Sequence, residues 1–413
     1  MLTTLFAAAR SSAVSPSAGL RHALPPLSAH SPFLPRARHL SMALKTGIVG
    51  LPNVGKSTLF NALMQESQAQ AANFPFCTIE PNTGVVAVPD PKLSVLADIN
   101  HSQKVVPTSL SFVDIAGLVA GASKGEGLGN QFLANIRECD AIVHVVRCFE
   151  DENIIHVSGS VDALRDIEVI SLELALSDLA QVERRAERAA KDLKSGKTKP
   201  EEMAALEKLQ KLLDEGKPAR QADLSEAESE SVRSLGLLSA KPVIYAANVM
   251  DTDLAEGNQM VEDVKKHAES EGASVVVVSA QVESELVELD DEERTSFLEE
   301  LGVARGETGL EKLIAQVYSL LNLRTYYTSG ETETKAWTIT KGMRAPQAAG
   351  VIHSDFEKGF IRAETVSNHV HVAYDDLVSA GSMKAAKDAG TVRAEGKEYE
   401  VKEGDIMLFR FNV

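Results

Sequence analysis

Short hydrophobic runs recur along the chain, with amphipathic stretches between them. The runs are rich in Val, Ile, Leu and Ala without strict polar alternation, and lie at residues 46–49, 84–88, 109–113, 141–146, 243–247 and 274–278. This pattern favours strands that are buried on both faces. Strands that alternate with helices predict a doubly wound α/β domain. Ligands in such a sheet bind beyond the carboxyl ends of the strands, so polar motifs that follow these runs are the candidate sites.

Residues 162–238 interrupt this alternation with two stripes of helical spacing, Val169, Leu172, Leu176 and Leu179, and then Met203, Leu206, Leu209 and Leu213. A polar turn that ends at Pro200 separates them, and proline suits the first position of a helix. We therefore expect a helical hairpin inserted into the α/β domain. Its first arm and turn are rich in basic residues: Arg184, Arg185, Arg188, Lys191, Lys194, Lys197 and Lys199. Such a run is either a solvated helix face or a contact for RNA phosphate.

The character of the chain changes again near residue 322. Short runs of strand-like residues alternate with Gly-rich turns, at 336–340, 359–362, 398–401 and 406–411. This predicts a separate, small α+β module over 322–411, after a nucleotide-binding type of domain over 42–321. The histidines of the module, His353, His369 and His371, do not match a zinc-ligand spacing.

Composition and charge narrow the class of protein. The chain has 413 residues, of which 44% are hydrophobic and 24% charged, and its net charge is −17. That charge argues against coating of DNA or RNA by bulk attraction, so an RNA contact needs a local basic patch. Hydrophobic runs are too short to predict a membrane span. The cysteines, Cys77, Cys139 and Cys148, are too few for a disulfide framework.

Residues 1–41 differ from the rest of the chain. They contain Arg10, Arg21, Arg36 and Arg38 among Ser, Ala and Pro, and the first acidic residue of the chain is Glu66. This composition is typical of an organellar transit peptide, with the mitochondrion as the first expectation and the plastid as the second. One alternative is an extension that has no targeting function. The other is a cytoplasmic form that starts at Met42.

The segment from Gly50 to Ser57 reads GLPNVGKS, between the run at 46–49 and a predicted helix. This strand–loop–helix pattern predicts a phosphate-binding P-loop, because its backbone N–H groups and the helix N-terminus both attract anions. Lys56 would reach the β- and γ-phosphates and Ser57 would ligate Mg²⁺. The nucleotide-binding candidates here are Asn53, Val54, Gly55, Lys56, Ser57 and Thr58.

Two further motifs extend the site. Asp114–Gly117 reads DIAG after the run at 109–113, so Asp114 is a candidate Mg²⁺ partner and the N–H of Gly117 a candidate γ-phosphate donor. Thr78 lies where a switch threonine would ligate Mg²⁺, which completes a metal set of Ser57, Thr78 and Asp114.

The base-recognition loop departs from the pattern NKxD, in which Lys packs over the base and Asp pairs with guanine. Residues 248–251 read Asn248-Val249-Met250-Asp251, so the Lys is lost and the Asp remains. Guanine recognition is weakened rather than excluded. Ser279 and Ala280 would form the last base-contacting loop. Leu118 stands where Ras-type enzymes carry the glutamine that orients water.

These motifs, together with Asn73–Asn82, Ala345–Gly350, Asp355–Arg362 and Phe411–Val413, closely resemble the YchF family of Obg-like ATPases over residues 43–413. The resemblance implies a Ras-like G domain, an inserted coiled-coil-like helical domain and a C-terminal TGS domain of β-grasp type. It implies a preference for ATP, with adenine read by Asn248 and by the backbone around Val249 and Met250. It also implies that catalysis rests on Lys56, on Mg²⁺, on backbone amides such as that of Gly117, and on either a partner or a further cation. In related enzymes an asparagine at the position of Asn53 binds K⁺; the alternative is that Asn53 only stabilises its own turn.

The sequence thus predicts a monomeric, Mg²⁺-dependent P-loop ATPase that switches between nucleotide states and associates with the ribosome or ribosomal RNA. One alternative is an Obg-type GTPase that uses Asp251. Another is a nucleotide-gated binding module or scaffold whose hydrolysis is incidental.

Overall fold

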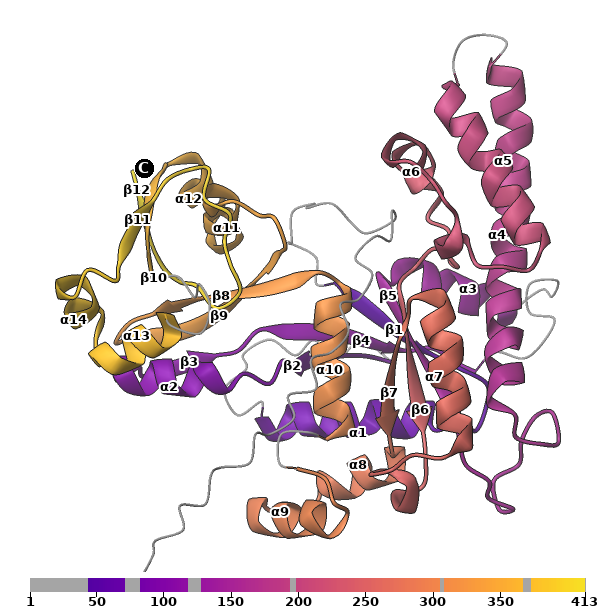
Figure 1. Cartoon of the computed structure of the whole chain (residues 1–413), viewed down its shortest axis with the longest axis horizontal. Coiled ribbons are helices and arrows are strands. Elements are labelled where there is room, and N and C mark those ends of the chain that lie inside the picture. Colours follow the sequence, from indigo (N-terminus) through magenta and orange to yellow (C-terminus); the bar gives the residue numbers. More distant parts are fainter. Residues whose placement is uncertain are drawn as a thin grey trace, which may run out of the picture.

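Two six-stranded sheets organise the chain, in the strand orders β2-β4-β1-β5-β6-β7 and β11-β10-β12-β8-β9-β3 (Figure 1). The structure, a computed structural model, describes residues 44–70, 82–117, 128–193, 198–304, 308–366 and 373–412. The sheets lie side by side, and a pair of helices projects from the outer side of the first (Figure 1).

The strands of the first sheet are the predicted hydrophobic runs. They are β1 (Lys45–Val49), β2 (Thr83–Ala87), β4 (Ser109–Asp114), β5 (Ala141–Arg147), β6 (Val243–Asn248) and β7 (Ser274–Val278). All neighbours are parallel except β2, which runs antiparallel to β4. Every residue of β5 and β6 is buried, which explains why their sequences lack alternation.

Helices cover this sheet and confirm the doubly wound α/β fold. They are α1 (Lys56–Gln70), α3 (Leu128–Glu138), α4 (Ala163–Leu193), α7 (Gln259–Glu271), α8 (Ala280–Leu286), α9 (Asp291–Glu300) and α10 (Gly309–Leu320). Helix α7 packs on β6, β7 and α4, whereas α1 packs on β1, β2, β4 and α8. One hydrophobic cluster joins the strands to all of these helices except α9, which packs with α8 in a smaller cluster, so the sheet holds its loops at fixed positions.

Helices α4 and α5 (Pro200–Asp214) form the predicted hairpin, followed by α6 (Glu226–Val232), with Pro200 at the first turn of α5. The predicted stripe on α5 is confirmed, since Leu206, Leu209 and Leu213 are buried. The stripe predicted on α4 is confirmed only in part: Val169 and Leu179 pack against hydrophobic clusters, whereas Leu172 is 45% exposed. The buried face is shifted to Ile167, Ile170, Leu174, Ala175, Val182 and Ala189. Buried Asp166 and Asp178 lie on that face and interrupt its hydrophobic spacing.

The second sheet contains β8 (Leu323–Ser329), β9 (Glu333–Thr340), β10 (Phe360–Val366), β11 (Arg393–Glu395) and β12 (Ile406–Phe411). Its helices are α11 (Ala345–Ile352), α12 (Ser354–Lys358), α13 (Ala373–Ala380) and α14 (Met383–Asp388). β8 and β9 form a hairpin, and the last strand, β12, lies parallel to β8 at the centre. This is the expected β-grasp arrangement. The strand predicted at 398–401 is wrong: only Glu400 forms an isolated bridge, with Arg344, because the segment is a turn after Gly396.

The second sheet is not built by the C-terminal residues alone. Strand β3 (Lys104–Val106) pairs in parallel with β9, and α2 (Pro91–Asn100) packs on β8 and β9. The prediction of a separate module is therefore corrected, because a segment between β2 and β4 supplies an edge strand to that module. No described helix has both the length and the apolar character needed to cross a membrane.

Candidate nucleotide site

The loop between β1 and α1 has the backbone of a P-loop. Gly50 and Gly55 have φ angles of +154° and +97°. A Cβ at Gly50 would lie 2.5 Å from Val145 O, and one at Gly55 would lie 2.4 Å from Asn248 Nδ2. Both positions therefore require glycine on conformational and steric grounds. The helix begins at Lys56, and the N–H of Leu59 donates to Gly55 O at 2.9 Å, so the first-turn N–H groups remain available to an anion.

Lys56 lies inside the curve of this loop. Its side chain is buried, and Nζ donates to Leu51 O at 2.7 Å. Burial lowers the pKa of Lys56 to about 8, and the nearby Asp114 carboxylate opposes that shift. A Cβ at Gly117 would lie 3.0 Å from Lys56 Nζ. The structure thus brings together Lys56 and Gly117, the residues predicted for the γ-phosphate.

Two of the three predicted metal ligands meet beside the loop. Ser57 Oγ donates to Asp114 Oδ2 at 2.9 Å. The other carboxylate oxygen, Asp114 Oδ1, is buried and has no hydrogen-bond partner among the described residues. A buried oxygen without a partner, next to a hydroxyl, is a donor set that suits Mg²⁺. The described parts of the chain hold no group of three or more His, Cys, Asp or Glu side chains suited to a metal ion.

Asn248 joins the P-loop to the loop after β7. Its Nδ2 donates to Val54 O at 2.9 Å, and its Oδ1 accepts from the N–H of Ala280 at 2.9 Å. The side chain is buried, and its neighbour Val249 is buried as well. Ser279 caps α8 by accepting from Val282 N–H. The structure therefore gathers Val54, Asn248 and Ala280 at one place, and adenine recognition by this group stays a prediction.

The remaining predicted residues lie around this centre. Thr58 is exposed on the first turn of α1, and Met250 is half-buried at the end of the loop after β6. Asp251 is exposed and accepts from Thr252 N–H at 2.8 Å. Thr78 and Leu118 lie outside the described residues.

The sequence reasoning missed a loop that supports the P-loop. Arg147, at the end of β5, is buried and donates to the carbonyls of Phe149, Asp151 and Ile154 at 3.0–3.1 Å. The next residue, Ile155, accepts from Asn53 Nδ2 at 3.1 Å, and Asn53 has a φ of +62°. The available indication was a charged residue, Arg147, at the end of a strand that is apolar apart from His144. These contacts support the turn role of Asn53, while its Oδ1 has no partner among the described residues.

The fold and this site define the class: a P-loop nucleotide-binding protein with a GTPase-type domain. A family model described as "50S ribosome-binding GTPase" matches residues 45–178. A model for the YchF GTPase C-terminus, described as a protein of unknown function, matches residues 323–412.

Relatives define the family. A protein of Bacillus subtilis named "Ribosome-binding ATPase YchF" is 54% identical over 375 residues, which span 90% of this chain and all of the relative. A protein of the same name from Escherichia coli O157:H7 is 56% identical over 373 residues, with the same shares. A solved structure, the Schizosaccharomyces pombe YchF GTPase, superposes with a TM-score of 0.80 at 40% identity, over 91% of this chain and 99% of that one. The chain belongs to the YchF family, as its motifs predicted.

Proposed function

We propose that the protein is an Mg²⁺-dependent ATPase that binds the ribosome in a nucleotide-dependent manner. The single observation that carries the hydrolase part is the approach of Ser57 Oγ and Asp114, 2.9 Å apart, beside buried Lys56. The names of the bacterial relatives support ATP as the nucleotide and the ribosome as the partner.

The residues have distinct roles in this proposal. Lys56 and the first-turn N–H groups of α1 hold the phosphates, with Lys56 exchanging its bond to Leu51 O for a phosphate oxygen. Ser57 and Asp114 hold Mg²⁺, with Thr78 as the third ligand; the metal would neutralise charge that develops on the β–γ bridge. The N–H of Gly117 would donate to the γ-phosphate. Leu118 stands in the sequence where Ras-type enzymes carry the water-orienting glutamine, and a hydrocarbon side chain cannot orient water, so slow intrinsic turnover is expected.

Base choice follows from the loop after β6. Val249 is buried where NKxD proteins carry a lysine, so no amine packs over the base. Asp251 is exposed and could still pair with guanine, and the S. pombe relative is called a GTPase. Competition between ATP and GTP for the purified chain, followed by turnover with each, decides the matter. Tighter binding of ATP supports the proposal, whereas tighter binding of GTP makes the protein an Obg-type GTPase.

Potassium is proposed as a second cation at Asn53. Substitution by glycine, N53G, removes the amide but tolerates the positive φ. If Asn53 ligates K⁺, wild-type turnover is faster in K⁺ than in Na⁺ and N53G loses that difference. If Asn53 only supports the turn through Ile155 O, N53G retains the same response to both salts.

Ribosome association is tested by co-sedimentation with purified bacterial ribosomes in the presence of ATP, ADP or no nucleotide. Binding in at least one state, reversed by salt, supports the proposal. If ATP promotes binding and a slowly hydrolysed ATP analogue promotes it equally well, hydrolysis is not needed for binding and the scaffold alternative is favoured.

We further propose that the β-grasp unit acts as a TGS domain. We also propose that the protein works as a monomer, which light scattering would test.

We propose, from composition alone, that residues 1–41 direct the chain to mitochondria. A fluorescent protein fused behind these residues should enter mitochondria. Import into plastids would show that the segment is a plastid transit peptide. Diffuse fluorescence would favour a cytoplasmic form.

A further inference from the structure

A cavity lined by four arginines lies between α3, α4 and the 3₁₀ turn Arg233–Leu235, away from the P-loop. Its volume is about 620 Å³. Arg137 comes from α3, whereas Arg184 and Arg185 come from one turn of α4 and Arg188 from the next. The spacing of Arg184 and Arg188 places them on one face of the helix, about 6 Å apart along its axis. The cavity is therefore a strip of guanidinium groups rather than a single charge.

Most of this charge is not neutralised by the protein. Arg185 forms an ion pair with Glu202, with an N–O distance of 2.5 Å, and is the one cavity arginine that pairs with a carboxylate of the described residues. Arg184 Nε donates to Ala180 O at 2.8 Å, and Arg137 Nη2 reaches Gln181 Oε1 at 3.4 Å, so both contacts are to neutral groups. Arg137, Arg184 and Arg188 are all exposed.

The buried carboxylate of Asp178 interacts electrostatically with Arg137, but within the described part of the chain it forms no hydrogen bond or ion pair with a cavity arginine. Asp178 is fully buried and accepts hydrogen bonds from Leu238 N–H, Ser239 N–H and Ser239 Oγ at 2.6–2.8 Å. Its oxygens are therefore occupied on the side of the helical hairpin.

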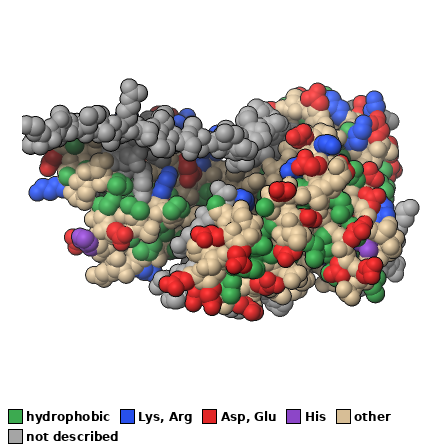
Figure 2. Space-filling view, turned by 60° about the horizontal axis from the view of Figure 1, so that its bottom comes forward, with side chains coloured by type: hydrophobic (Ala, Val, Ile, Leu, Met, Phe, Trp, Pro, Cys, Tyr) green, Lys and Arg blue, Asp and Glu red, His purple; other side chains and the backbone are tan. Residues whose placement is uncertain are grey.

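We infer that this cavity is a binding site for the sugar–phosphate backbone of ribosomal RNA. The inference rests on the proposed ribosome association and deepens it by naming the surface. Guanidinium groups recognise phosphate by paired, planar hydrogen bonds. With a net charge of −17, and with acidic side chains widely spread on the face seen in Figure 2, contact with RNA needs such a local patch.

The lining also indicates which part of RNA is recognised. The apolar residues of the cavity are Leu133 and Leu235, and none of the described residues that line it is aromatic. Base stacking is therefore limited to the guanidinium planes, so phosphate contacts should dominate and the contact should depend little on RNA sequence. Leu133 and Arg137 belong to α3, the first described helix after the Asp114–Gly117 motif, so bound RNA would touch the helix that follows the γ-phosphate motif.

The test compares the full chain with the double variant R184Q/R188Q. The control is K265Q/K266Q on α7, which removes the same charge from exposed residues of the G domain. Co-sedimentation with ribosomes is measured at several salt concentrations, with naked ribosomal RNA or polyglutamate as competitor. ATP turnover and the melting temperature show that each variant is folded.

We expect R184Q/R188Q to bind ribosomes about tenfold or more weakly, and to lower the slope of log affinity against log salt by about two units. The control should match the wild type, and RNA should compete better than polyglutamate. Equal binding by R184Q/R188Q and the control overturns the inference while the proposed function stands. Competition by polyglutamate but not RNA also overturns it, in favour of an acidic protein partner. Failure of the wild type to sediment under every condition overturns both proposals.

Discussion

Gly55 and Asn248 lie so close together that a methyl group added at Gly55 would distort the P-loop. In G55A the new Cβ would lie 2.4 Å from Asn248 Nδ2, at a φ of +97° that disfavours L-residues. The bonds of Asn248 to Val54 O and Ala280 N–H would have to shift. We expect ATP affinity to fall at least about tenfold and the free energy of unfolding by about 1–3 kcal/mol. Calorimetric titration with ATP and urea unfolding measure the two effects.

The control for this substitution is G236A. Gly236 has a φ of +58°, and a Cβ there would meet nothing within 4 Å. It should lose only about 1 kcal/mol of stability, the cost of the left-handed backbone, and bind ATP as the wild type does. If G55A also retains wild-type affinity, the contact between Gly55 and Asn248 does not shape the site.

Glu283 makes stability depend on pH. Its side chain is 1% exposed, and burial raises its pKa from 4.5 to about 7, against hydrogen bonds from Leu310 and Gly309 N–H. Between these values the folded protein holds a proton that the unfolded chain has released, so stability falls as pH rises through this window. Above pH 7 the penalty is complete, on the order of 3 kcal/mol. E283Q should therefore melt higher than wild type at about pH 8 and nearly equally at about pH 5.

E288Q is the matched control, because Glu288 is exposed on the residues just after the same helix. It should leave the melting temperature unchanged at both pH values. A gain for E283Q that is equal at both pH values would mean that packing, rather than ionisation, is responsible.

At the residue level, the sequence predicted groups that nucleotide chemistry itself requires. Lys56, Ser57 and Asp114 were predictable because phosphate and Mg²⁺ dictate residue type and spacing. The hydrogen bonds from Asn248 to Val54 and from Asn53 to Ile155 could not be predicted, because each joins residues that are about a hundred or more positions apart in the chain.

At the scale of elements, α4 belongs to two parts of the molecule. Its first half packs on the G-domain sheet through Ile167, Ile170 and Leu174, and its second half packs in the hairpin through Val182 and Ala189. The spacing of Leu172 and Leu176 suggested one stripe, but a helix with two different partners does not keep one apolar face. The inner strands β1, β5 and β6 were predictable because nearly all of their residues are buried and most are apolar.

Asp178 anchors the return of the hairpin to the sheet. It accepts from the N–H groups of Leu238 and Ser239 and from Ser239 Oγ, and burial raises its pKa against these bonds. D178A would leave buried N–H groups without an acceptor, so we expect a loss of about 2–4 kcal/mol in urea unfolding. E187A, at an exposed position of the same helix, should change stability by less than about 0.5 kcal/mol. Equal effects of the two substitutions would show that Asp178 does not anchor the hairpin.

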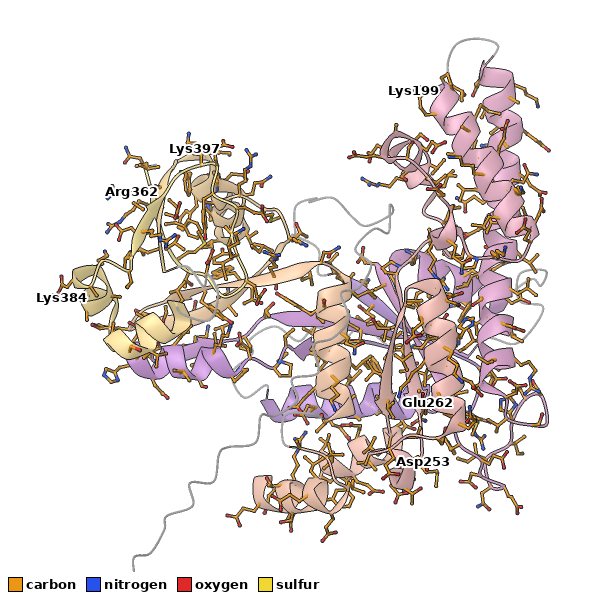
Figure 3. All side chains as sticks on the ribbon, in the orientation of Figure 1. Lys199, Asp253, Glu262, Arg362, Lys384 and Lys397 are labelled. Atoms are coloured by element: carbon orange, nitrogen blue, oxygen red, sulfur yellow. The ribbon has the colours of Figure 1, made fainter. Side chains whose placement is uncertain are left out.

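At the scale of the whole molecule, charge differs between its parts. Figure 3 places Lys199 at the tip of the hairpin and Lys397 on the C-terminal unit, whereas Asp253 and Glu262 lie together at the lower side of the G domain. Residues 163–238 contain 13 Lys and Arg against 16 Asp and Glu, and residues 322–413 contain 12 against 13, so most of the negative charge of the chain lies in the G domain. RNA would therefore be repelled least at the hairpin and at the C-terminal unit.

The two sheets are joined by a segment that sequence analysis did not predict. Strand β3 has only three residues and lies in a polar stretch of the sequence, and its partner β9 is more than 200 residues away, so no local pattern indicates the pairing. Side-chain hydrogen bonds stabilise the pairing of β3 with β9. Ser102 Oγ donates to Gly330 O at 2.7 Å, and Asn100 Nδ2 donates to Ser329 Oγ at 2.8 Å. Movement of the C-terminal unit would therefore pull on the segment between β2 and β4.

Two adjacent tyrosines test this join. Tyr327 and Tyr326 are both buried, but the Tyr327 hydroxyl donates to Asp90 Oδ2, at the N-cap of α2, at 2.7 Å, whereas that of Tyr326 donates to Ala348 O, inside the C-terminal unit, at 2.9 Å. Y327F and Y326F should each lose about 1–3 kcal/mol of stability. Only Y327F should speed amide hydrogen exchange over residues 91–106, because only that hydroxyl crosses between the units. If both variants speed exchange there equally, the C-terminal unit and the α2–β3 segment open together, and the Tyr327–Asp90 bond is not what holds them.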